Sequence, residues 1–119
     1  MTVLQALAIL EAAVLECKQR NVDTQEVREA LDFLEPHIRP AWLVPQYRHA
    51  LDGHGNREYD REGQQQVLRP SFEGIRKSVC DLLATRLDKL KRQFAATHDV
   101  KVKKKIARLT PEYEKLKEF

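Results

Sequence analysis

Two imidazoles and a carboxylate lie within six residues of one another, in the run His49-Ala50-Leu51-Asp52-Gly53-His54. Such groups ligate transition metals, and further acidic residues follow just downstream. The run matches no zinc motif, because it contains neither His-Glu-x-x-His nor a cysteine. A polar loop whose histidines bind nothing explains the same residues. A metal would use His49, Asp52 and His54, but we expect no resident metal or other cofactor.

Arg48 and His54 form a second chemical pair, with five residues between them. This spacing resembles the Arg and His motif of the helical HEPN nucleases, over seven residues of the chain. The resemblance implies a ribonuclease site assembled across a dimer, in which Arg48 orients a phosphate and His54 moves a proton. A HEPN-like ribonuclease is therefore one alternative function.

The remaining residues give no indication of an enzyme. Cys80 lies within an apolar helical pattern, where a thiol usually packs without reacting. Ser71 and Ser78 have no histidine or acid at a spacing typical of nucleophilic catalysis, and no glycine-rich phosphate loop occurs. We therefore expect a non-catalytic protein.

The densest positive charge lies in the run 101–108, which reads Lys-Val-Lys-Lys-Lys-Ile-Ala-Arg. Lysines on one exposed helix face bind a phosphate backbone without reading bases, and do so in a salt-dependent manner. The candidate nucleic-acid contacts are Lys101, Lys103, Lys104, Lys105 and Arg108. The run has no interleaved aromatic residues for base stacking. Val102, Ile106 and Leu109 also fit an ordinary amphipathic helix with a solvated basic face, which is the simpler explanation.

The net charge of +3 conceals an asymmetry along the chain. Residues 1–60 hold six Lys or Arg and ten Asp or Glu, a net charge of −4. Residues 61–119 hold fifteen Lys or Arg and eight Asp or Glu, a net charge of +7. Such a chain can neutralise itself internally or against a second copy, or it can leave a basic surface for an acidic partner.

The longest helix that the sequence predicts lies between the His49–His54 run and the basic run 101–108. Apolar residues between 72 and 94 recur at steps of three and four, namely Phe72, Ile75, Val79, Leu82, Leu83, Leu87, Leu90 and Phe94. This period predicts one amphipathic helix over about 70–97. We place its start at Pro70, since proline suits a first helical position. The alternative is a start near Gln64, with Pro70 inside the helix.

The first helix is predicted over the apolar stretch 3–15, with Thr2 and Gln5 as a capping box. This stretch is apolar nearly all round, with Ala6, Ala8, Ile9, Ala12, Ala13 and Leu15 beside its main face. Such a helix is buried on several sides or contacts another protein chain. The pattern therefore indicates self-association, most simply as a dimer.

Shorter helices are predicted on either side of the long one. Asp23 or Thr24 can cap a second helix, which ends at the proline-rich stretch 36–45. A short third helix then begins at the second or third of these prolines, with Trp42 in the core.

The C-terminal region is predicted to hold one or two further helices. Asp99 can cap a helix that contains Val102, Ile106 and Leu109. The sequence Thr110-Pro111-Glu112 carries the signals of a new helix start, a cap followed by proline and an acid.

Together these patterns predict a single all-α domain over 1–119, a compact bundle of five or six helices without strands. Cys17 and Cys80 lie in helical patterns without a C-x-x-C motif, which favours two buried free thiols in a reducing compartment. The apolar start lacks the features of a secretory signal and is too short for a membrane span, so we expect a cytoplasmic protein. The favoured function is protein interaction or self-association. Nucleic-acid binding through 101–108 is the alternative.

Overall fold

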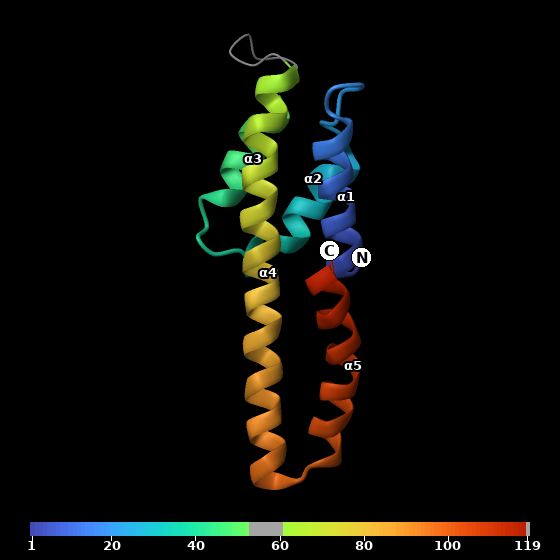
Figure 1. Ribbon diagram of the computed structural model, residues 1–119, viewed down its shortest axis with the longest axis vertical. Coiled ribbons are helices and arrows are strands. Elements are labelled where there is room, and N and C mark those ends of the chain that lie inside the picture. The colour runs from blue at the N-terminus through green and yellow to red at the C-terminus, as the bar shows by residue number, and fades with distance from the viewer. Residues whose placement is uncertain (53–60, 119) are drawn as a thin grey trace. The chain divides into compact units, whose positions relative to one another are not determined.

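Residues 1–52 and 61–118 are described by a computed structural model, in which they form five α-helices and one short 3₁₀ helix (Figure 1). No strand occurs within these two ranges, which confirms the all-helical prediction. The chain divides by its contacts into two units, Met1–Ser78 and Val79–Phe119. Each unit is described separately below as unit 1 and unit 2.

Helix α1 spans Val3–Glu16 and begins at the predicted capping box. The Gln5 amide N–H donates to Thr2 Oγ1 at 3.1 Å, and the Thr2 amide N–H donates to Gln5 Oε1 at 2.8 Å. Two donors that the helix cannot satisfy by itself are thereby paired. One face of α1 is buried, through Ala6, Leu7, Leu10, Ala13 and Val14.

Helix α2 spans Gln25–Leu34 and packs directly against α1. Its cap is Thr24, whose Oγ1 accepts from the Val27 amide at 3.3 Å, while Asp23 instead binds Arg28. The 3₁₀ helix η1, Glu35–His37, follows at once and contains Pro36. The predicted end of the second helix near this proline is therefore confirmed.

Helix α3 spans Leu43–Leu51, so its start lies between the two predicted prolines. Leu43, Tyr47 and Leu51 are buried, but the prediction for Trp42 is wrong because this side chain is 60% exposed. Each residue turns a helix by roughly 100°. Trp42 directly precedes the buried stripe that starts at Leu43, so its side chain points away from the core.

Helix α4 spans Arg61–Thr97, and the predicted start at Pro70 is wrong. Pro70 lies inside the helix, as in the alternative that began near Gln64. The turns before it are held by buried side chains: Leu68 is fully buried, and the side-chain amide of Gln64 donates from Nε2 to the Ala50 carbonyl at 2.9 Å. These tertiary contacts offset the backbone hydrogen bond that proline cannot make.

Unit 2 consists of the C-terminal half of α4 and of α5, Val100–Glu118, which runs back beside it (Figure 1). Asp99 caps α5 as predicted, because its Oδ1 accepts from the Lys101 amide at 2.9 Å. The predicted new start at Thr110 is wrong. Helix α5 continues through Pro111, and the Thr110 hydroxyl donates back to the Ile106 carbonyl at 2.7 Å.

The two cysteines are both free thiols, as predicted. Cys17 is buried in unit 1, and burial raises the pKa of its thiol. Cys80 in unit 2 is only partly buried, so the prediction of a buried thiol is wrong for this residue. Within the described residues, none of the helices combines the length and apolarity that a bilayer crossing requires.

Tyr47 joins α3 to α1 inside unit 1. Its side chain is fully buried, and its hydroxyl donates to the Leu10 carbonyl at 2.8 Å. Burial raises the pKa of this phenol, because the phenolate would lose its hydration. The phenol in the unfolded chain ionises above about pH 10, whereas the folded protein keeps the proton, so the free energy of unfolding falls above that pH.

We expect Tyr47→Phe to be less stable than the wild type by about 1 kcal/mol near neutral pH, through the lost hydrogen bond. Above about pH 10 the gap narrows, because only the wild type loses up to about 1.4 kcal/mol per pH unit through this phenol. Urea unfolding followed by circular dichroism at both pH values measures the difference. Other titrating groups are common to both proteins and cancel. A gap that is constant with pH would contradict the prediction.

Candidate nucleic-acid interface

The five predicted contact residues of the basic run all lie on the surface of α5. Lys101, Lys103, Lys104, Lys105 and Arg108 are exposed, whereas Val102 is buried and Ile106 is partly buried. The amphipathic pattern predicted for this run therefore holds. The exposed cations are available to a partner.

The C-terminal half of α4 adds positive charge that the sequence analysis did not name. Arg86, Lys89, Lys91 and Arg92 are exposed in the same unit. Residues 86–108 together hold nine Lys or Arg and two Asp, a net charge of +7. The signal was present in the sequence, but it is split between two helices and only the denser run stood out.

Few of these charges are neutralised within the part of the chain that the structure describes. Arg92 pairs with Asp88 at 3.2 Å, but the two side chains are 81% and 63% exposed, so the pair is weak. Asp99 uses its carboxylate to cap α5. No other ion pair involves a cation of 86–108 among the described residues. The basic surface is therefore largely uncompensated.

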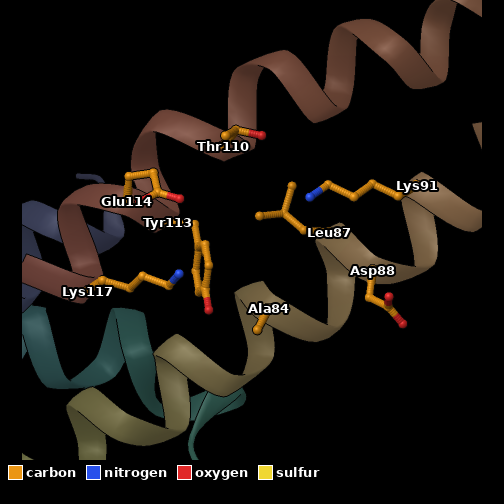
Figure 2. Close-up of a pocket in the computed structure, with 8 residues that line it drawn as sticks. All are labelled: Ala84, Leu87, Asp88, Lys91, Thr110, Tyr113, Glu114 and Lys117. Atoms are coloured by element: carbon orange, nitrogen blue, oxygen red, sulfur yellow. The ribbon is translucent and has the colours of Figure 1, made fainter.

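A groove of about 210 Å³ lies between the two helices of unit 2. Figure 2 shows Leu87 and Lys91 of α4 pointing into the gap toward Thr110 and Tyr113 of α5. The Lys117 ammonium lies 4.7 Å from the centre of the Tyr113 ring. The groove is smaller than typical small-molecule sites of about 300 Å³ or more, and it is lined by both signs of charge. It does not define a ligand.

The predicted contact surface on α1 is narrower than the sequence indicated, because much of the helix is buried within its own unit. Its outward side carries exposed Ala8 and Leu15 with partly buried Ile9 and Ala12. Leu15 is 55% exposed. A groove of about 340 Å³ beside these residues extends to Val27 of α2.

Arg48, the predicted phosphate-orienting residue, holds α3 against the end of α2. Its Nη2 lies 2.8 Å from Glu35 Oε2 and also pairs with Asp32. The hydrogen bond to Glu35 raises the pKa of this guanidinium. We call this set the Arg48 clamp. His54, the second residue of the HEPN-like pair, lies outside the described residues.

The metal candidates are likewise only partly placed. Asp52 is at the C-terminal end of α3, where its carboxylate lies 3.4 Å from the Arg28 guanidinium. His49 is exposed on the same helix, and His54 is outside the described ranges. Among residues 1–52 and 61–118, no three His, Cys, Asp or Glu side chains gather as a metal would require.

Comparison with known proteins adds no assignment: no family model, no curated protein and no solved structure matches this chain.

The Arg48 clamp predicts a measurable coupling between Arg48 and Glu35. We expect Arg48→Met and Glu35→Gln each to lower the free energy of unfolding, with a coupling of about 0.5–1 kcal/mol in a double-mutant cycle. The coupling shrinks at high ionic strength, because both groups are solvent-accessible.

The matched control is the pair of Glu73 and Arg76, which lie 3.1 Å apart on one helix. This local pair is expected to couple by only about 0.2–0.5 kcal/mol. Urea unfolding of both cycles gives the comparison. If the Arg48 cycle couples no more strongly than the control, the clamp does not hold α3 to α2.

Proposed function

We propose that the protein is a non-catalytic binding protein that attaches to the phosphate backbone of nucleic acid through the basic surface of unit 2. A single observation carries this proposal: nine cations and two acids lie within residues 86–108. Among the described residues, only one of these cations, Arg92, forms an ion pair, and that pair is weak. Uncompensated surface cations release counterions from nucleic acid on binding, which drives association at moderate salt.

The residue types fit backbone contact better than base recognition. Lysine is a compact, strongly hydrated charge that meets phosphate without demanding a fixed geometry. Binding of this kind is independent of sequence and weakens steeply with salt. The free thiols of Cys17 and Cys80 are consistent with a protein that acts in a reducing compartment such as the cytoplasm.

Neutralising two adjacent lysines of α5 tests the proposal. We expect Lys104→Gln with Lys105→Gln to weaken binding to a labelled mixed-sequence oligonucleotide by about tenfold, because two phosphate contacts are lost. The control is Arg69→Gln with Lys77→Gln, which removes the same charge from exposed positions of unit 1. Fluorescence anisotropy at low salt measures both. Equal losses in the two variants would show that net charge alone governs binding and would contradict a defined surface.

Self-association is a second candidate, and the exposed side of α1 favours it. Leu15 is a large apolar side chain that is 55% exposed, and the small residues Ala12 and Ala8 lie one and two turns before it on the same side of the helix. Small residues let two helices approach closely, and a leucine opposite them can fill the space. We propose α1 as the contact between two copies.

Replacing Leu15 with glutamate is expected to convert a dimer to a monomer, because the charge would be buried without a partner. The control is Val100→Glu, which places the same charge at an apolar residue of unit 2 that is 64% exposed. Light scattering after size exclusion gives the mass of each protein. A wild type that is monomeric at tens of micromolar would contradict this second proposal.

A further inference from the structure

The cations of α5 are not spread evenly around the helix. Lys104 and Lys105 lie three and four residues after Lys101, and Arg108 lies four and three residues after them, which places all four on one face. All four are exposed in the structure. At about 1.5 Å per residue this stripe is roughly 10 Å long. We call these four residues the α5 stripe.

Lys103 is an internal reference for the stripe. It is exposed and lies on the same helix, but its position in the helical period puts it on another side. Lys103 and Lys104 therefore differ in direction, while they share residue type, exposure and local charge density.

The aromatic rings of unit 2 are engaged elsewhere among the described residues. Phe94 is in edge-to-face contact with His98, at 5.5 Å between ring centres, and Tyr113 lies under the Lys117 ammonium. The stripe itself contains no ring. Proteins that hold single strands gain about 1–3 kcal/mol for each base that stacks on an aromatic side chain. The α5 stripe has no such contribution and depends on phosphate charge alone.

A surface that depends on phosphate charge alone favours the polyanion with the highest charge density. Double-stranded DNA carries one negative charge per about 1.7 Å of its axis, and its counterion release per contact exceeds that of a single strand. We propose that the partner of the α5 stripe is a nucleic-acid duplex, held by its backbone and without base recognition. This inference rests on the proposed nucleic-acid function and specifies its substrate class.

The test uses the full chain and anisotropy titrations with labelled duplex DNA, duplex RNA and single strands of the same length. We expect both duplexes to bind several-fold more tightly than the single strands, with no dependence on sequence. Four contacts predict a slope of about −3 to −4 for log K against log salt on duplex DNA. Lys104→Gln should reduce the magnitude of this slope by about one, whereas Lys103→Gln should reduce it by clearly less.

The outcomes separate the two proposals. Equal binding of duplexes and single strands would overturn the duplex assignment and leave nucleic-acid binding in place. Equal effects of Lys103→Gln and Lys104→Gln would overturn the stripe as the contact surface. No binding to any of the nucleic acids at low salt would overturn the proposed function itself. Circular dichroism of each variant verifies that its helices are intact.

Discussion

The packing of unit 1 depends on contacts that stabilise the first turns of α4 against α1 and α3. A proline inside a helix costs about 3 kcal/mol, and Pro70 imposes this cost. Gln64 and Gln65 each donate a side-chain hydrogen bond to a backbone carbonyl of another helix, in α3 and α1 respectively. At about 1 kcal/mol for each bond, with about 2 kcal/mol for burying Leu68, these contacts match the cost of the proline. Helix α4 therefore continues through Pro70 because its contacts with α1 and α3 stabilise it.

The two units use their charged residues differently. In unit 1, arginines pair with acids: Arg28 donates two hydrogen bonds to Asp23 and lowers the pKa of that carboxyl, and Arg48 joins two carboxylates. Guanidinium groups suit such fixed pairs because their donors are planar and directional. In unit 2 most cations are lysines, and the described ones have almost no acidic partners. The charged side chains of unit 1 therefore stabilise the fold by pairing with one another, whereas most cations of unit 2 face solvent and can contact a partner.

Local signals in the sequence were sufficient for much of the fold. The Thr2 cap, the Thr24 cap and the Asp99 cap all form where the sequence places them, because each needs only residues three or fewer positions away. The prediction for Pro70 is wrong because contacts with distant residues, such as that of Gln64 with Ala50, hold the turns before it. Pro70 and Pro111 lie within helices despite the local preference for a helix start.

In the candidate site too, the features set by local sequence were predicted and those set by distant contacts were not. The exposure of the lysines in α5 follows from the apolar period of Val102 and Ile106, which is visible in the sequence. The pairing of Arg48 with Asp32 joins residues sixteen positions apart and depends on how α3 meets α2. No spacing rule predicts such a contact. The same holds for Trp42, whose exposure follows from the position at which α3 begins.

A solvated helix face and a binding surface differ in the sign of their neighbouring charges. A face that only has to be hydrated can mix signs, as α2 does with Glu26, Arg28 and Glu29. The α5 stripe instead places like charges three and four residues apart, and each such pair destabilises an isolated helix by about 0.2–0.5 kcal/mol. Its first cation, Lys101, also lies in the first turn, which has no acid after the Asp99 cap and where the helix dipole disfavours positive charge. Phosphate groups beside the stripe would relieve both costs, which supports the proposal that this face binds a polyanion.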